Sequence, residues 1–305
     1  MEKNKKILKI GLILIGIVLV INIGFAIFIK LDNPVFLKSY NENIAYLVPE
    51  EEAFNEIGYQ IYYITNVDDK RRVSDITFKE APEIEVYAGE NLGFHGLFNP
   101  IFGGDSYNDE IYGRYVLRQV YIRLDLNNLD KDFNSIELNN AKINFDNGDI
   151  LEQDLGRLII YNEKEKSDSL EFLGGGSSSD GTSNVDINIK EDITLVKMES
   201  PLLEDIEDGI EIKVGKNNGH GIDYRKIEGI EYKKGDKLII DSKLTIEKGS
   251  TKSFNSYNIV PLLYFKDKDR NLSRVQVFNL IDHYNKNYDY SFIGILKYLK
   301  SKGEI

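Results

Sequence analysis

The chain of 305 residues contains no cysteine, no tryptophan and only three histidines. Without cysteine there can be no disulfide framework, thiol nucleophile, zinc knuckle or iron–sulfur cluster. Three histidines leave little material for a metal site. These absences argue against most metal-dependent and catalytic classes of protein, and we expect neither a catalytic residue nor a cofactor.

Positive charge is also scarce, since 38 lysines and arginines face 50 aspartates and glutamates, a net charge of −12. A protein this acidic is not expected to bind nucleic acid in general, because the phosphate backbone would repel it. At roughly 150 residues per domain, the length predicts about two domains, each large enough to bury its own core.

The strongest single pattern is an uncharged run over residues 10–29. A helix of this length is about 30 Å long, which matches the hydrocarbon thickness of a bilayer. A cleaved secretory signal is the alternative, but its apolar region has about 7–15 residues and ends at a small-x-small site. Here the run ends in Phe-Ala-Ile-Phe-Ile-Lys. We therefore predict that residues 10–29 are an uncleaved transmembrane signal anchor.

Four lysines precede the run, at positions 3, 5, 6 and 9. Because positive residues stay on the cytoplasmic side, residues 1–9 are expected to form a short cytoplasmic tip and the bulk of the chain to lie outside the cell membrane. Residues 1–30 hold five lysines and one glutamate, which leaves 33 of the 38 basic and 49 of the 50 acidic side chains outside, a net charge of −16. The predicted exterior is thus more acidic than the whole chain.

The chain contains an internal repeat. Residues 84–96 match residues 210–221 in the pattern I-E-[VI]-x-x-G-x-N-x-G-(x)-H-G, with Phe94 as the single insertion. Asp-Ile-Thr at residues 75–77 recurs at 192–194, and residues 157–162 recur as 274–279, both at an offset of 117 residues. Three matches in the same order predict two copies of one module.

Both copies are rich in short strands, because apolar and polar residues alternate at residues 120–126, 141–145 and 244–246. Asn147-Gly148 directly follows one of these strands and is typical of a tight hairpin. With turn signals between the strands and little helical periodicity, we predict a mainly β protein. Its expected form is two tandem immunoglobulin-like antiparallel β-sandwich modules behind the N-terminal transmembrane helix, with a barrel as the alternative.

The boundaries follow from composition. We expect a stalk at residues 30–55, a first sandwich at 56–173, a second sandwich at 185–281 and a C-terminal cap with a short helix at 282–305. Residues 174–184, Gly-Gly-Gly-Ser-Ser-Ser-Asp-Gly-Thr-Ser-Asn, have the composition of a flexible linker. A hairpin loop is the alternative, because residues 170–173 and 185–189 could pair across this segment.

Residues for catalysis or metal binding are not apparent. His95 and His220 lie in the repeated glycine loop, where a loop-bracing hydrogen bond explains them more simply than catalysis, and His283 has no metal-spaced neighbour. HExxH, P-loop and G-x-S-x-G patterns are absent from the sequence, and no segment satisfies the EF-hand pattern. The acidic residues 204–208 are read as a solvated loop, with calcium binding as the alternative.

One stretch differs between the copies: after the first repeated loop the chain is rich in aromatic residues, whereas the second copy is charged there. Aromatic side chains on a loop are typical of binding surfaces. The candidate binding surface consists of Phe94, Phe98, Phe102, Tyr107 and Tyr112. The alternative is that these rings fill a seam between modules, or between a module and the stalk.

The sequence thus favours a non-catalytic, membrane-anchored extracytoplasmic binding or accessory protein of the cell envelope. Its expected partner is another envelope protein or a wall polymer, with the membrane contacted through the N-terminal helix and nucleic acid excluded. An extracytoplasmic hydrolase that uses carboxylates is one alternative, and it requires a cleft with two close carboxylates, one of raised pKa. A structural spacer that holds a partner off the membrane is the other.

Overall fold

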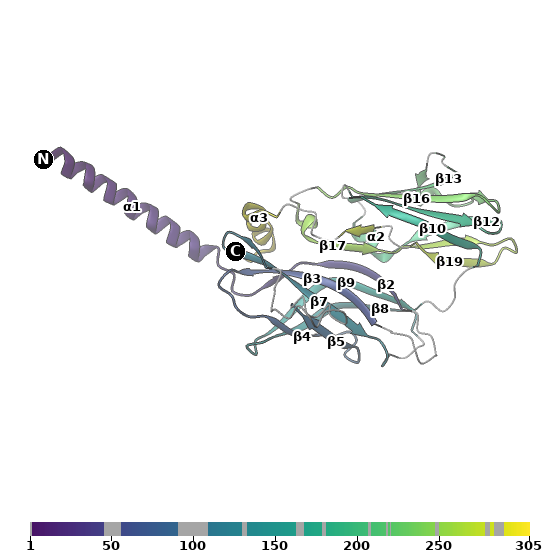
Figure 1. Ribbon diagram of the computed structural model, residues 1–305, viewed down its shortest axis with the longest axis horizontal. Coiled ribbons are helices and arrows are strands. Elements are labelled where there is room, and N and C mark those ends of the chain that lie inside the picture. Colours follow the sequence, from purple (N-terminus) through teal and green to yellow (C-terminus); the bar gives the residue numbers. More distant parts are fainter. Residues whose placement is uncertain are drawn as a thin grey trace, which may run out of the picture.

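The computed structural model describes residues 2–45, 56–90, 109–129, 133–162, 168–178, 181–206, 209–217, 219, 221–247, 250–277, 281–283 and 290–305. The protein is mainly β, with several sheets that form two packed bodies beside a long N-terminal helix (Figure 1). This agrees with the predicted class.

The first sandwich is built from two sheets that enclose one apolar core. Sheet 1 has the order β1-β3-β7-β5, and β6 also pairs with β7. Its strands are β1 (Val35–Phe36), β3 (Glu56–Asn66), β5 (Glu85–Gly89), β6 (Glu110–Tyr112) and β7 (Tyr115–Asp125). Sheet 2 has the order β20-β17-β2-β9-β8-β4. Its strands are β2 (Ser39–Ala45), β4 (Val73–Phe78), β8 (Ser135–Phe145), β9 (Ile150–Asn162), β17 (Ser256–Ile259) and β20 (Ile281–His283).

Local sequence explains the β8–β9 hairpin. Along the second half of β8, Ala141, Ile143 and Phe145 are buried while the residues between them are more exposed, as period-two alternation requires. The turn is closed by hydrogen bonds from the Phe145 amide to the Asp149 carbonyl (2.9 Å) and from the Gly148 amide to the Phe145 carbonyl (2.9 Å). Gly148 has a φ of 88°, which favours glycine. The predicted Asn147-Gly148 hairpin is confirmed.

Two further sheets enclose a core of their own and form the second sandwich. Sheet 3 has the order β10-β11-β16-β13-β14. Its strands are β10 (Leu170–Ser177), β11 (Thr182–Ile189), β13 (Ile210–Lys216), β14 (Ile222–Asp223) and β16 (Lys237–Leu244). Sheet 4 has the order β15-β12-β18-β19. Its strands are β12 (Ile193–Glu199), β15 (Glu231–Tyr232), β18 (Leu262–Lys266) and β19 (Leu272–Gln276).

The strand pairings of the two sandwiches correspond. The order β1-β3-β7-β5 of sheet 1 recurs as β10-β11-β16-β13, and the order β4-β8-β9 recurs as β12-β18-β19, with antiparallel pairs throughout. Each sequence match lies on strands of equivalent position. The 75–77 match joins β4 to β12, the 84–96 match includes β5 and β13, and the 157–162 match joins β9 to β19.

The expected stalk is wrong for residues 35–45. β1 pairs with β3, and β2 lies between β9 and β17 and runs parallel to both. Ala45 and Phe36 belong to the core of the first sandwich. The prolines at 34 and 49 and the glutamates at 50–52 favour a stalk, but the backbone groups of residues 35–45 find partners in strands that are far away in the sequence.

The Gly/Ser segment is not a linker between the sandwiches. Residues 170–177 pair with residues 183–189 as the β10–β11 hairpin, with a bulge between Phe172 and Gly174. The hairpin alternative is therefore correct, but the hairpin belongs to the second sandwich. Glycine is required at position 175, because a Cβ there would lie only 2.7 Å from the Asn184 carbonyl oxygen.

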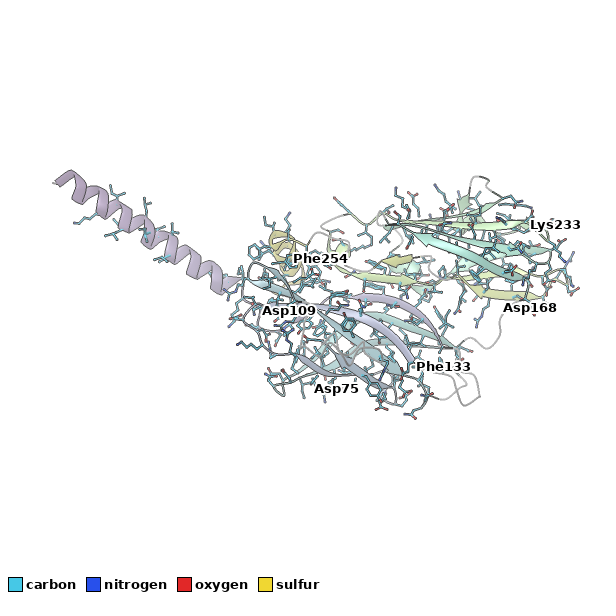
Figure 2. All side chains as sticks on the ribbon, in the orientation of Figure 1. Asp75, Asp109, Phe133, Asp168, Lys233 and Phe254 are labelled. Carbon is cyan, nitrogen blue, oxygen red and sulfur yellow. The ribbon has the colours of Figure 1, made fainter. Side chains whose placement is uncertain are left out.

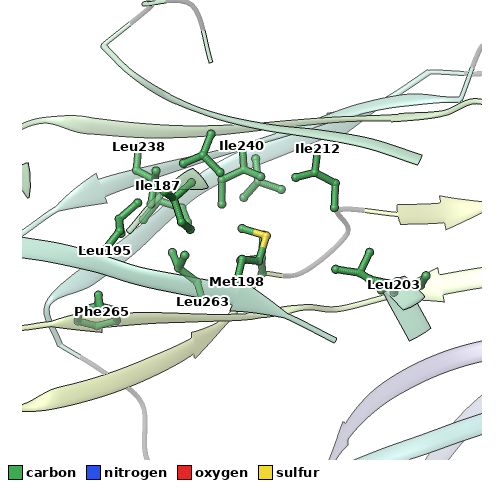
Figure 3. Packing of buried hydrophobic residues seen from close by; sticks show 14 of the residues in the cluster. Ile187, Leu195, Met198, Leu203, Ile212, Leu238, Ile240, Leu263 and Phe265 are labelled. Atoms are coloured by element: carbon green, nitrogen blue, oxygen red, sulfur yellow. The ribbon is translucent and has the colours of Figure 1, made fainter. Parts of the chain in front are cut away.

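The two sandwiches are joined through sheet 2. One face of sheet 2 covers the first core, and Ile159, Tyr257 and Ile259 on the other face belong to the core of the second sandwich. That core contains Ile187, Leu195, Met198, Ile240 and Leu263 (Figure 3). The short helix α2 (Pro201–Asp205) adds Leu202 and Leu203. The β17 strand of the C-terminal half thus completes a sheet of the N-terminal half.

Helix α1 (Glu2–Phe28) extends away from the sheets (Figure 1), and Ile29 and Leu31, which follow it, pack in one cluster with helix α3 (Phe292–Lys302). Ile29, Leu31, Tyr115, Ile295 and Leu299 form a third cluster at this base. The Ser291 hydroxyl caps α3 and Gly303 ends it with a φ of 75°, so the predicted short C-terminal helix is present. Within the part of the chain that the structure describes, no helix combines the length and apolar character that a membrane crossing requires. The predicted transmembrane span is not confirmed.

Candidate functional site

The outer face of sheet 3 carries a groove of about 570 Å³ near the β10–β11 hairpin. Four strands contribute to it. Its lining residues are Gly176, Ser177, Ser178, Thr182, Ser183, Asn184, Glu211, Lys213, Asp241, Ser242 and Lys243. We call this set the sheet 3 groove.

The register of the strands explains why these residues meet. One row across the sheet consists of Gly176, Asn184, Asp241 and Lys213. The next row consists of Thr182, Lys243 and Glu211. Residues two positions apart along a strand point to the same face, so both rows face outward. Neighbouring strands lie about 4.8 Å apart, which brings each row within reach of one extended ligand.

Small residues keep one wall of the groove low. Gly176 has no side chain, and a Cβ there would lie 3.3 Å from the Asn184 side-chain oxygen. Ser177 and Ser178 follow it, whereas Ser183 and Ser242 alternate with the outward rows, point to the other face of the sheet and hydrogen-bond to each other at 2.8 Å. The backbone of β10 is thus accessible from the outer face, and hydroxyl groups provide hydrogen-bond donors and acceptors beside it.

The charges of the groove balance. Lys213 and Lys243 lie opposite Asp241 and Glu211 in the pairing register, and all four side chains are exposed. Such a surface repels neither anions nor cations, and it offers carboxylate, ammonium, amide and hydroxyl groups together. This arrangement suits an uncharged ligand rich in hydroxyl or amide groups.

A hydrolase that uses carboxylates needs one carboxyl group with a raised pKa, and no such group lines the sheet 3 groove. Among the described aspartates and glutamates with shifted pKa values, only Glu42 is raised, because burial penalises its charged form. Glu42 is 0% exposed, so its carboxylate does not face a cleft. Glu42 therefore does not meet the criterion for a carboxylate-dependent hydrolase.

Glu42 lies at the junction of the two sandwiches. Its carboxylate accepts hydrogen bonds from the Tyr161 hydroxyl on β9, the Ser200 hydroxyl before α2 and the Val260 amide after β17, each at 2.7 Å. Nearby, Arg157 donates to Glu137 (2.7 Å) and to Asp205 of α2 (2.8 Å). The junction is held by directed polar contacts as well as by the shared apolar core.

Of the five residues in the predicted aromatic surface, the structure describes Tyr112. Phe94, Phe98, Phe102 and Tyr107 lie outside the described residues, so that surface stays a prediction. Tyr112 ends β6, and its hydroxyl donates to Glu110 at 2.7 Å. Its ring lies 5.9 Å from that of Tyr290 and packs beside the cluster at the base of α1. For Tyr112, the packing agrees with the seam alternative.

The described residues on either side of segment 91–108 are tied together. Arg72 donates to Glu90 at 2.9 Å and, through both terminal nitrogens, to Asp109 at 2.8 Å. Asp109 is labelled in Figure 2. Burial alone would raise the pKa of Asp109, but the hydrogen bonds and charge of Arg72 lower it below its usual 3.8. This ion pair network fixes the two ends of the segment to β4.

Metal ligands do not converge in the described part of the chain, where no group of three or more histidine, aspartate and glutamate side chains could hold an ion. His95 and His220 lie outside that part. Sequence reasoning missed the sheet 3 groove, because its glycine and serine residues were assigned to a linker. The pairing of residues 170–173 with 185–189, weighed as the alternative, was the signal that pointed to it.

No protein-family model and no curated protein sequence matches the chain. Among solved structures, the D00-D0 domain of intimin is similar over 81% of this chain and 98% of its own, at 7% identity and a TM-score of 0.25. The human desmocollin-1 ectodomain is similar over 78% of this chain and 35% of its own, at 12% identity and a TM-score of 0.16. A conserved domain protein from Bacillus anthracis covers 72% of this chain and 80% of its own, at 7% identity and a TM-score of 0.17. TM-scores of this size carry no argument about function.

Proposed function

We propose that the protein is a non-catalytic binding or accessory protein of the cell envelope, and that the sheet 3 groove binds a hydroxyl-rich wall polymer. The observation that carries this proposal is the groove itself. It is open, spans four strands and balances two lysines against two carboxylates. A long neutral polymer can lie across such rows and exchange its hydroxyl groups for those of water at several strands at once.

We further propose that the two sandwiches are immunoglobulin-like and arose by duplication of one module. In chain order, the strands β1, β3, β4, β5, β7, β8 and β9 pair as A-B-E-D and C-F-G, which is the strand order of constant-type immunoglobulin domains. The same order holds for β10, β11, β12, β13, β16, β18 and β19. The sequence matches between equivalent strands support the duplication.

Attachment to the membrane through residues 10–29, with the sandwiches outside, is the part of the proposal that rests on the sequence alone. It is tested by fractionation. We expect the full chain to stay with membranes after alkaline carbonate extraction and a chain without residues 1–30 to be released. Release of the full chain would contradict membrane attachment.

Binding is tested by co-sedimentation of the purified full chain with insoluble peptidoglycan sacculi. We expect the double variant Lys213→Ala/Asp241→Ala to weaken binding at least about tenfold, because it removes two charged hydrogen-bonding groups from the central row. The matched control is Lys233→Ala/Asp192→Ala, which removes an exposed ion pair of 3.1 Å outside the groove. Lys233 is labelled in Figure 2.

Equal binding by the two double variants would contradict a role for the groove. Failure of the unchanged chain to sediment with the sacculi would contradict the wall polymer as its ligand. Both variants keep the net charge of the chain, so a difference between them cannot come from the overall charge.

A further inference from the structure

The outer edge of sheet 3 is formed by β10, which pairs only with β11 among the described strands. The strand has eight residues, and residues 171–177 are exposed. After Glu171 no charged residue follows until Asp180. Along its regular part, residues 174–177, the strand turns backbone N–H and C=O groups away from β11, and such an edge is a template for pairing with another strand.

Edges of native sheets are normally protected by short strands, charges, proline or bulges. The other edges here follow this rule in the described residues. β1, β14, β15 and β20 have only two or three residues. β4, β5 and β19 carry Asp75, Glu85 and Arg274 within five or six residues. The bulge of β10 lies before Gly174 and leaves residues 174–177 in regular pairing with β11.

We propose that two copies of this chain pair through β10, antiparallel and about a two-fold axis near Gly175. This joins the two five-stranded copies of sheet 3 into one continuous sheet. In that register Gly174 of one copy lies opposite Gly176 of the other, within the regularly paired residues 174–177, and the bulged Leu173 lies beside this contact. Leu173 is 50% exposed at the bulge, so a second copy beside it buries apolar surface that the single chain leaves in water.

A second copy fits this edge better than an unrelated polypeptide for two reasons. An antiparallel edge is complementary to itself under a two-fold axis, because each N–H meets a C=O of the other copy. In addition, the exterior of the protein carries a net charge of −16, so most of its surface repels another copy. Residues 172–179 form an uncharged stretch where two copies can approach.

Pairing would also lengthen the sheet 3 groove, an extension that rests on the proposed function. Gly174 and Gly176 belong to the outward rows, opposite Asp186 and Asn184. Because neither glycine has a side chain, no barrier separates the two grooves where the β10 strands meet. A two-fold axis perpendicular to the sheet keeps both grooves on the same face. Their joined length suits a polymer with repeated units.

The first experiment measures mass and needs no ligand, so it is independent of the proposed function. Light scattering of the full chain in detergent, corrected for bound detergent, should give twice the 35.0 kDa of one chain. Leu173→Lys places a charge at the edge and should raise the dimer dissociation constant at least about tenfold. The matched control is Leu272→Lys on the edge strand β19, where Leu272 is 62% exposed. This variant should stay dimeric.

A monomeric full chain at every concentration would overturn the proposal. So would a dimer that Leu173→Lys and Leu272→Lys weaken equally, because this would place the contact elsewhere. Circular dichroism of both variants checks that they are folded.

The second experiment tests the register and uses the absence of native cysteine. Directly opposed residues of an antiparallel pair have Cα atoms about 4.5–5.5 Å apart, which is within the range for a disulfide bond. Gly174→Cys/Gly176→Cys should therefore form a covalent dimer under mild oxidation, since a Cβ at 174 meets no atom within 4 Å and one at 176 meets only the Asn184 side-chain oxygen at 3.3 Å. Leu272→Cys/Arg274→Cys on β19 is the control and should stay monomeric on a non-reducing gel. Equal crosslinking of both variants, or none of the β10 pair, would overturn the proposed pairing.

Discussion

Removing the Glu42 carboxylate should weaken the junction between the two sandwiches. In Glu42→Ala, the Tyr161 hydroxyl, the Ser200 hydroxyl and the Val260 amide each lose an acceptor in a buried site. A buried polar group without a partner costs about 1–3 kcal/mol, and the two hydroxyls can rotate toward other acceptors, whereas the amide cannot. We expect the free energy of unfolding to fall by about 3–5 kcal/mol.

Glu42→Gln keeps the shape and one oxygen acceptor and should cost about 1–2 kcal/mol. The comparison of this variant with the wild type also has a pH dependence. Burial raises the pKa of Glu42 above its ordinary 4.5, so folding favours the protonated acid. The contribution of Glu42 to stability is therefore full below pH 4.5 and is lost as the pH rises through the folded pKa. The wild type should exceed Glu42→Gln by more at pH 4.5 than at pH 8.

The assay is urea unfolding of the full chain in detergent, followed by circular dichroism at both pH values. Glu152→Ala is the control, since this exposed carboxylate forms an ion pair of 2.6 Å with the exposed Lys79. Its unfolding midpoint should not move. The reasoning is refuted if Glu42→Ala costs less than about 1 kcal/mol, or if the advantage of the wild type over Glu42→Gln grows as the pH rises.

Three further changes probe the fold. Gly156→Ala should lower stability by more than about 3 kcal/mol, because the new Cβ would overlap the Ser39 backbone. Gly148→Ala, at a similar φ with no atom within 4 Å of the new Cβ, should cost only about 1 kcal/mol. Thermal unfolding compares the two variants, and equal costs would contradict a close approach of β2 to β9. Arg72→Ala leaves the Glu90 carboxylate, 2% exposed, without its ion pair and should cost about 3 kcal/mol at neutral pH. Because Arg72 also lowers the pKa of Asp109, the difference from the wild type should shrink as the pH falls below 3.8, and a difference that grew there would oppose this account. Deletion of residues 35–45, which would be harmless in a stalk, should expose the chain to limited proteolysis, and a protease-resistant product would contradict the placement of β2.

Local chemistry made some of this fold predictable. The Asn147-Gly148 turn needs only residues adjacent in sequence, since glycine accepts a positive φ and the flanking residues alternate. The C-terminal helix was predictable for the same reason, because its apolar spacing and its Ser291 cap are local.

Other features depend on partners that local patterns do not reveal. β2 pairs with residues 117 positions later on β9 and 217 positions later on β17, and nothing in its own composition indicates either neighbour. The glycine-rich β10 has the composition of a flexible coil but is ordered by its register with β11. The sheet 3 groove requires four strands in correct register, so its residues could not be grouped before the pairings were known.

The position of β2 also sets an order of events during folding. Residues 39–45 are synthesised 217 residues before their partners on β17, residues 256–259. Sheet 2 therefore cannot close until most of the chain is available, and parallel pairing over such a separation is slow. Until β17 is synthesised, the edge of β2 that it covers in sheet 2 stays without a partner strand. Strand β2 thus needs protection from premature association until β17 is available, although four of its seven residues are buried in the finished fold.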